Sequence, residues 1–165
     1  MILFRCVSDR ELERVLIGET VYGRFNNSKE YLNDSNMEQA VCFFAEKAAW
    51  LDRYHRYVLV LDIDEKDLEI GEGTYYIPSN FKNTKIWTGR DGYQRFVLKE
   101  AYKDKYEPSD VKGIFLLNNL RSRDMRELVE KNSSKFYIND TSQKHMWKNI
   151  YSFIDTLSEG EEKNV

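Results

Sequence analysis

The sequence predicts a single α+β domain in which helices flank a mixed β-sheet that is split into two packed halves. A continuous apolar run at residues 57–61 is typical of a central strand that is buried on both faces. Stretches rich in aromatic and β-branched residues at 93–106 and 111–117 indicate further strands. Helical periodicity appears at 9–17 and 142–157, and no repeat or linker divides the chain.

The composition is that of a globular protein. Of the 165 residues, 41% are hydrophobic and 32% are charged, so the chain can bury a core of its own. The net charge of −3 argues against a large basic surface for nucleic acid. No segment approaches the roughly 18 apolar residues of a membrane span, and no signal-peptide pattern is present. We therefore expect a cytoplasmic protein with no membrane partner.

Cysteine and histidine usage predicts no metal site and no disulfide. Cys6 and Cys42 are the only cysteines, and they form no CxxC pair. We expect both to pack as small apolar groups in a reducing compartment. His55 and His145 lie far apart, and neither belongs to a metal-binding motif.

The N-terminal residues predict a strand at 2–7 and a helix at 9–17. Ser8 has the position of an N-cap, and Glu11 has the position that completes a capping box. The strand carries one charge, Arg5, whose fixed donors suit a phosphate or a carboxylate. The alternative for Arg5 is a salt bridge at a strand edge.

The next part of the chain has two interpretations. A short strand at 19–25 and a polar loop at 26–36 precede it. Residues 37–54 have the spacing of one long helix, but 40–44 is also a run of strand formers, with a helix near 46–54. The predicted fold takes the second interpretation.

Past the central strand, residues 71–73 predict a glycine-containing turn into a short tyrosine-rich strand, without the spacing of a phosphate-binding loop. A short helix is expected at 123–131, followed by a brief apolar segment at 136–138. The wide apolar stripe at 142–157 predicts a helix that docks on the sheet. Residues 159–165 are expected to form a charged, frayed tail.

The strand at 93–106 carries a carboxylate, Glu100, on the side that Phe96 and Leu98 share. A carboxylate on an apolar side is unfavourable unless it is paired or faces a cleft. Glu100 is therefore either an edge-strand residue in water or the acid of a functional site.

The order of these elements resembles that of the ADP-ribosyltransferase superfamily over residues 2–117. The first motif is Leu-Phe-Arg-Cys-Val-Ser at 3–8, and the second is Val-Cys-Phe-Phe-Ala-Glu at 41–46 with the helix that follows. The third is Glu-Ala-Tyr from Glu100, ahead of Asp-Val-Lys-Gly-Ile at 110–114. The resemblance implies one ADP-ribosyltransferase-like domain at residues 1–158, with 159–165 as the tail.

The resemblance also implies an activity. Arg5 would hold NAD, and Glu100 would hydrogen-bond the nicotinamide ribose and favour an oxocarbenium-like transition state as nicotinamide leaves. Phe43 and Phe44 stand where the family usually has Ser-Thr-Ser or a Tyr, so they can stack on nicotinamide but offer no hydroxyl. The implied enzyme uses NAD without a metal and transfers ADP-ribose to an unknown protein or nucleic acid.

Two other functions are compatible with the sequence. Eleven tyrosines suit a non-catalytic protein-binding module that contacts a host or partner protein. An RNA-directed enzyme could place Lys99, Lys103 and Lys105 on a phosphate backbone. Acidic residues alternate with these lysines, which favours a solvated strand of mixed charge.

Overall fold

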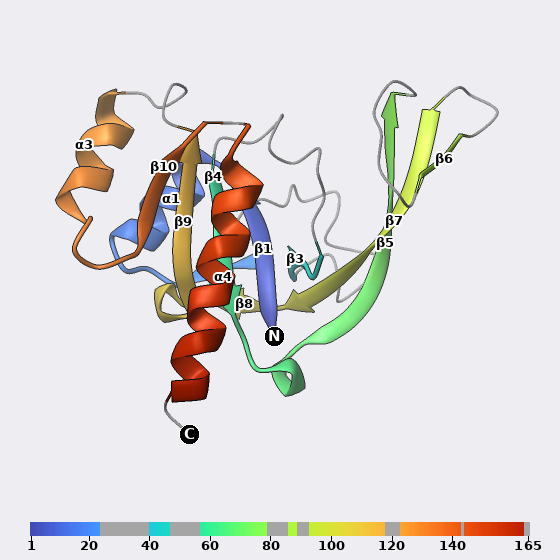
Figure 1. Cartoon of the computed structure of the whole chain (residues 1–165), viewed down its shortest axis with the longest axis horizontal. Helices are drawn as coiled ribbons and strands as arrows, with labels where there is room; N and C mark the ends of the chain where they lie inside the picture. Colours follow the sequence, from blue (N-terminus) through green and yellow to red (C-terminus); the bar gives the residue numbers. More distant parts are fainter. Residues whose placement is uncertain are drawn as a thin grey trace.

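The chain folds into an α+β structure, which confirms the predicted class. The computed structural model describes residues 1–23, 40–46, 57–78, 86–88, 93–117, 123–142 and 144–163. These ranges contain a mostly antiparallel sheet and three α-helices (Figure 1). The helices are α1 (Asp9–Leu16), α3 (Arg123–Lys131) and α4 (Met146–Lys163).

Eight strands form one hydrogen-bonded sheet. In chain order they are β1 (Ile2–Val7), β3 (Val41–Phe44), β4 (Tyr57–Asp62), β5 (Glu69–Pro78), β6 (Ile86–Thr88), β7 (Tyr93–Lys103), β9 (Val111–Leu117) and β10 (Ile138–Thr141). Their spatial order is β10-β9-β4-β1-β3-β7-β5, and β6 also pairs with β7. The two short strands β2 (Val21–Tyr22) and β8 (Lys105–Tyr106) pair separately.

The predicted split into two packed halves is replaced by this continuous sheet. The short strand β3 joins the two parts because it pairs with β1 on one side and β7 on the other. Its Phe44 lies opposite both Phe4 and Glu100. Figure 1 shows β5 and β7 leaving the body of the fold as a long twisted ribbon.

Helices cover both faces of the sheet. In Figure 1, α4 crosses in front of the sheet and α1 lies behind it. The face toward α1 and α3 buries Leu3, Val7, Leu59, Leu61, Ile114 and Leu116 against Leu12, Val15, Met125 and Val129. The face toward α4 buries Phe4, Val58, Val60 and Phe115 against Met146, Trp147, Ile150 and Phe153. The central strand β4 is buried on both faces, as its apolar run predicts.

These elements decide three expectations from the sequence. Residues 41–44 form a strand, which rules out one helix over 37–54, and the helix expected near 46–54 lies outside the described residues. The glycine turn expected at 71–73 is wrong, because these residues lie inside the continuous strand β5. Helix α4 continues to Lys163, through much of the segment expected to be a frayed tail.

Helix α1 begins at the expected residue, but only one of the two hydrogen bonds of the predicted capping box forms. The Ser8 hydroxyl accepts a hydrogen bond from the Glu11 backbone N–H at 3.2 Å, which confirms Ser8 as the N-cap. The Glu11 carboxylate instead pairs with Arg5 and Tyr106. The second half of the predicted capping box is therefore wrong, because the partly buried guanidinium of Arg5 binds the same carboxylate.

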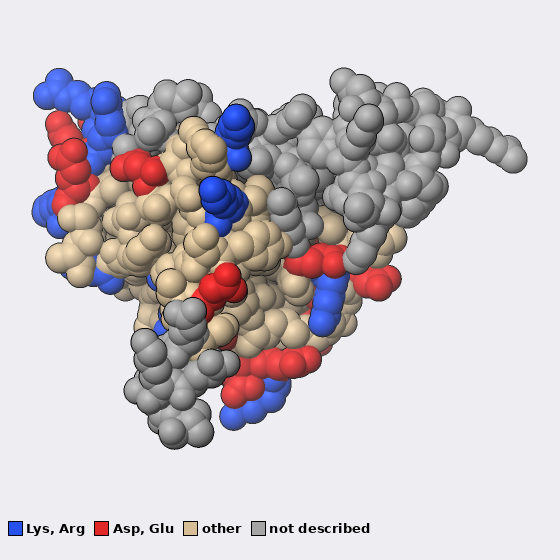
Figure 2. All heavy atoms as spheres, viewed as in Figure 1, with Lys and Arg blue, Asp and Glu red and all other residues tan. Residues whose placement is uncertain are grey.

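The described surface is mixed in charge. On the face shown in Figure 2, lysine and arginine atoms lie among aspartate and glutamate atoms over the body of the fold. None of the helices in the described ranges is long and apolar enough to cross a membrane.

Candidate functional site

Glu100 is buried in the middle of β7. It lies opposite Phe44 of β3 and Gly71 of β5, on the sheet face that carries Phe4 and α4. Only 3% of its surface is exposed, so it is not an edge-strand carboxylate in water. Burial of a carboxylate is unfavourable unless hydrogen bonds compensate it, so its neighbours decide what it can do.

Two glycines of β5 make room for Glu100 and its neighbour. A Cβ atom on Gly73 would lie 2.1 Å from Oε1 of Glu100, and one on Gly71 would lie 3.1 Å from Cε2 of Tyr102. The carboxylate and the phenol ring therefore lie directly on the β5 backbone. A Gly-x-Gly spacing inside a strand places both glycines on one face, and this was the signal in the sequence for such a close approach.

Two neutral donors hold the Glu100 carboxylate. The Tyr102 hydroxyl donates to Oε2 of Glu100, and the thiol of Cys42, directly across from Tyr102, also hydrogen-bonds Glu100. Burial, reinforced by the Glu100 carboxylate, raises the pKa of Cys42 to about 12. The same two causes raise the pKa of Tyr102 above its ordinary value. Both groups therefore keep their protons at neutral pH. We call Glu100, Tyr102 and Cys42 the Glu100 cluster.

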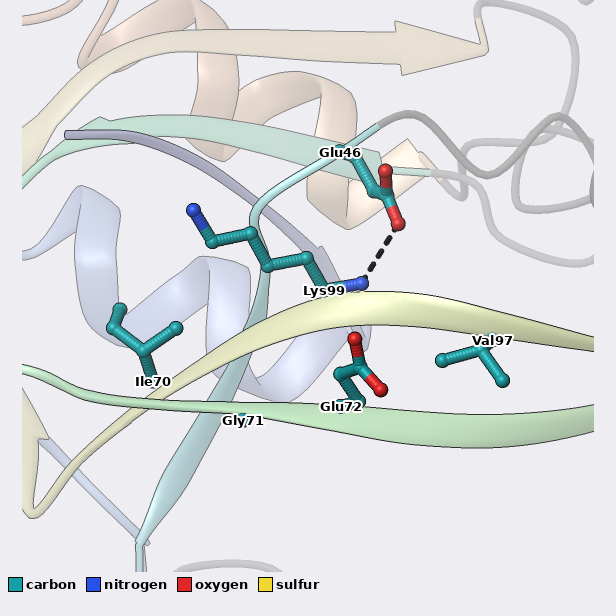
Figure 3. A pocket seen from close by; sticks show the side chains of 6 residues that line it. All are labelled: Glu46, Ile70, Gly71, Glu72, Val97 and Lys99. Atoms are coloured by element: carbon teal, nitrogen blue, oxygen red, sulfur yellow. Dashed lines mark hydrogen bonds between the residues drawn. The ribbon is translucent and has the colours of Figure 1, made fainter.

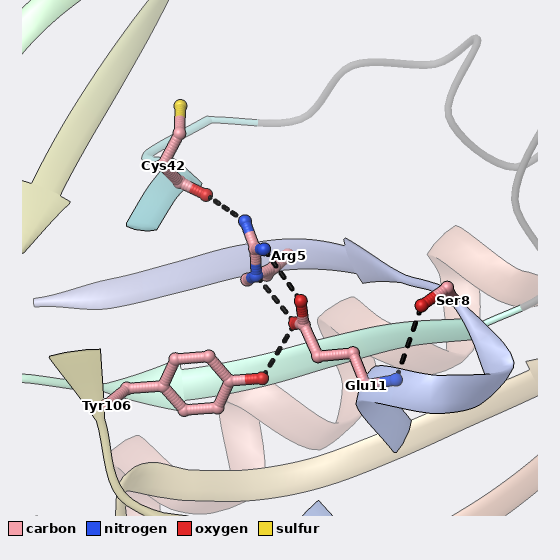
Figure 4. Close-up of polar contacts among 5 residues, drawn as sticks. All are labelled: Arg5, Ser8, Glu11, Cys42 and Tyr106. Atoms are coloured by element: carbon pink, nitrogen blue, oxygen red, sulfur yellow. Dashed lines mark hydrogen bonds and ion pairs between the residues drawn. The ribbon is translucent and has the colours of Figure 1, made fainter. Parts of the chain in front are cut away.

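Arg5 belongs to a different network, on the face of the sheet that carries α1 (Figure 4). Its Nε and Nη2 atoms donate to the two Glu11 oxygens at 2.7 and 2.8 Å, and Nη1 donates to the Cys42 carbonyl at 2.8 Å. The Tyr106 hydroxyl donates to the same Glu11 carboxylate at 2.8 Å. Burial opposes the charge of Arg5, but the contact with Glu11 outweighs it and raises the pKa of Arg5.

This network ties four elements together. Arg5 comes from β1, Glu11 from α1, Cys42 from β3 and Tyr106 from β8. The Glu11 side chain is only 1% exposed, whereas that of Arg5 is 17% exposed. In this structure the charge of Arg5 faces a protein carboxylate, as in the salt-bridge alternative, but β1 lies between β3 and β4 and not at the edge of the sheet.

The structure does not bring the four predicted site residues together. Phe44 and Glu100 lie on the α4 face, whereas Arg5 and Phe43 lie on the α1 face. Phe43 is fully buried and packs edge-on against Tyr106, with ring centroids 5.8 Å apart. The separation follows from the alternation of side chains along a strand, combined with the pairing of Phe4 with Phe44.

Sequence reasoning gave no site role to Tyr102 and expected only apolar packing for Cys42. Its carbonyl accepts from Arg5, and Figure 4 shows its sulfur pointing away from Arg5. Once 41–44 is taken as a strand, alternation places Cys42 on the same face as Phe44. The thiol is uncharged and hydrogen-bonded, so it is suited to positioning Glu100 and not to nucleophilic attack.

An open pocket of about 690 Å³ lies on the other face of the β5–β7 ribbon (Figure 3). It is lined by Glu46, Ile70, Gly71, Glu72, Val97 and Lys99. Oε1 of Glu46 accepts from the Lys99 backbone N–H at 2.8 Å, which holds the end of β3 against β7. Val97 and Lys99 alternate with Leu98 and Glu100, so the strand separates this pocket from the Glu100 carboxylate.

Among the residues that the structure describes, no group of three His, Cys, Asp or Glu side chains could hold a metal ion. Cys6 and Cys42 are free thiols. Comparisons with models of protein families, with curated proteins and with solved structures find no match for the chain.

Proposed function

We propose that the chain is an ADP-ribosyltransferase-like enzyme that uses NAD as its substrate, with Glu100 as the charged group of the site. The observation that carries this proposal is the buried Glu100 carboxylate, fixed by Tyr102 and Cys42 over the backbone of Gly73. A preorganised carboxylate in a site that excludes water acts strongly on a positive charge that develops in a transition state.

The proposed reaction breaks the bond between the ribose C1′ carbon and the nicotinamide nitrogen. The bonding electron pair leaves with neutral nicotinamide, and positive charge develops on the ribose ring. The Glu100 carboxylate opposes that charge. An acceptor group on a protein or nucleic acid then attacks C1′ and releases its proton to solvent; with water as the acceptor, the product is ADP-ribose.

The other predicted site residues take unequal parts in this proposal. Phe44 shares the face of Glu100 and can offer its ring to nicotinamide, whereas Phe43 is part of the core on the opposite face. Arg5 supports β3 through the Cys42 carbonyl. Direct contact between Arg5 and NAD stays a prediction.

The test is to incubate the protein with NAD and to follow nicotinamide release and the transfer of labelled ADP-ribose to a cell lysate. We expect Glu100→Gln to fold and to bind NAD, and to lose nicotinamide release by about 10²–10³-fold. Glu72→Gln is the matched control, because Glu72 is an exposed glutamate on the opposite face of the neighbouring strand. Equal activity of Glu100→Gln and the parent protein would remove Glu100 from the mechanism.

The second candidate is a non-catalytic protein-binding module. It is favoured by Tyr22, Tyr137 and Tyr151, which are among the large hydrophobic side chains exposed in the described chain. The NAD experiment separates the two functions. Release of nicotinamide without transfer indicates a hydrolase, and the absence of both release and NAD binding leaves the binding module as the better account.

A further inference from the structure

A shallow groove of about 260 Å³ lies between the edge strand β10 and helix α4, far from Glu100. Its lining consists of Tyr137, Asn139, Asn149, Ser152, Phe153 and Thr156. Five strand spacings separate β10 from β7, which is about 24 Å across the sheet. The groove is thus a separate place in the molecule from the Glu100 cluster.

An aromatic stack forms one side of the groove. The rings of Tyr137 and Phe153 are stacked, with centroids 4.4 Å apart and planes at 16°. Phe153 is fixed from beneath, because its ring packs on Phe115 and a Cβ on Gly113 would lie 2.7 Å from it. Tyr137 is 48% exposed. The stack therefore ends in an accessible aromatic ring on a rigid base, which is a platform for another planar ring.

Two amides lie beside this stack. The Asn149 side-chain nitrogen donates to Oγ1 of Thr141 at 2.8 Å and to Oδ1 of Asn139 at 3.2 Å. Both N–H groups of Asn149 are thereby used. Oδ1 of Asn149 and Nδ2 of Asn139 have no hydrogen-bond partner in the described part of the chain. They leave an acceptor and a donor next to each other.

The groove carries no charge of its own. All six lining residues are neutral, and the charged residues Lys148 and Asp155 that adjoin them in α4 have opposite signs. This argues against a site selected for phosphate and in favour of a neutral, planar group that stacks and hydrogen-bonds in its plane. A nucleobase has these properties. A volume below the roughly 300 Å³ of typical small-molecule sites suits one base.

We propose that the groove between β10 and α4 binds a single nucleobase, stacked on Tyr137 and hydrogen-bonded to Asn139 and Asn149. The base could belong to a free nucleoside or to an unpaired position in a single strand. This proposal does not depend on the NAD chemistry of Glu100.

The test is a titration of the isotope-labelled protein, followed by the side-chain amide and backbone signals in NMR. The probes are adenosine, cytidine, guanosine and uridine, followed by five-nucleotide single-stranded RNAs. We expect the amide signals of Asn139 and Asn149 to shift. Binding to RNA at much lower concentration than to any nucleoside identifies a strand as the source of the base, and equal affinity identifies the free nucleoside.

Variants assign the binding to the groove. Tyr137→Leu keeps an apolar cover over Phe153 but removes the stacking ring, and should weaken binding by about 5- to 100-fold. Tyr151→Leu is the control, since Tyr151 is an exposed tyrosine of α4 outside the groove lining, and it should leave binding unchanged. The proposal is overturned if no probe shifts these signals or if both variants weaken binding equally.

Discussion

Gly73→Ala tests whether the Glu100 carboxylate really lies on the backbone of β5. The added methyl carbon would stand 2.1 Å from Oε1 and 2.6 Å from Cδ of Glu100, so the carboxylate must move. Overpacking of a buried site costs about 1–3 kcal/mol. Loss of the hydrogen bond from Tyr102 to a charged group adds about 1.5–3 kcal/mol. Replacing a glycine within a strand by alanine stabilises the folded state by about 0.5–1 kcal/mol, which offsets part of this loss.

The net expectation is a loss of about 1.5–5.5 kcal/mol in the free energy of unfolding, measured by urea denaturation with circular dichroism. Gly71→Ala is the control and should cost less stability. A Cβ atom at this position would lie 3.1 Å from the Tyr102 ring, and a small movement of the ring relieves the contact. In the double variant Gly73→Ala/Glu100→Ala the penalty should largely disappear, which gives a coupling energy of at least about 1 kcal/mol. A change of less than about 0.5 kcal/mol in Gly73→Ala would refute the close approach.

Four further variants probe the two faces of β3 and its neighbours. Glu11→Gln leaves the Arg5 charge partly buried without its carboxylate, and should cost about 3–5 kcal/mol in urea denaturation; a change near zero would contradict the buried pair. Phe43→Ala should cost about 3–5 kcal/mol because Phe43 is fully buried, and Phe44→Ala should cost less because Phe44 is partly exposed; equal losses would contradict the assignment of faces. Because the pKa of Cys42 rises from 9.0 to about 12 in the folded protein, the unfolded thiol ionises first and stability should fall as pH rises through this window. Cys42→Ala should lose less stability over the same window, and identical pH profiles would exclude the thiol as a contributor.

The parts of the fold that the sequence predicts well are those with a local cause. The apolar run of β4 needs only its own residues to indicate burial on both faces, and Ser8 caps α1 through a contact three residues away. The glycines of β5 have a distant cause. Gly71 and Gly73 are required by side chains about 30 residues later: the Gly-x-Gly spacing indicates that both positions share one strand face, but it does not identify Glu100 and Tyr102 as the side chains that approach them.

The sequence indicates candidate site residues individually, but it does not indicate which of them lie on the same face of the sheet. Glu100 is a candidate because a carboxylate interrupts an apolar side of its strand, which is a local signal. Whether Arg5 joins it depends on the pairing of β1 with β3, since a shift of one residue would move every side chain of a strand to the other face. The observed pairing of Phe4 with Phe44 places Arg5 and Glu100 on opposite faces.

The strand β3 nevertheless connects the two networks through a single residue. The Cys42 carbonyl accepts from Nη1 of Arg5, and the Cys42 thiol hydrogen-bonds Glu100. Loss of the hydrogen bond from the Arg5 guanidinium to Cys42 should therefore loosen β3 and disturb the position of Glu100. This effect requires no contact between Arg5 and a ligand. Arg5→Lys keeps the charge but not the planar donor set. If Arg5 acts through β3, the variant should lose thermal stability and nicotinamide release together. If Arg5 instead contacts NAD, NAD affinity should fall while the melting temperature stays nearly constant.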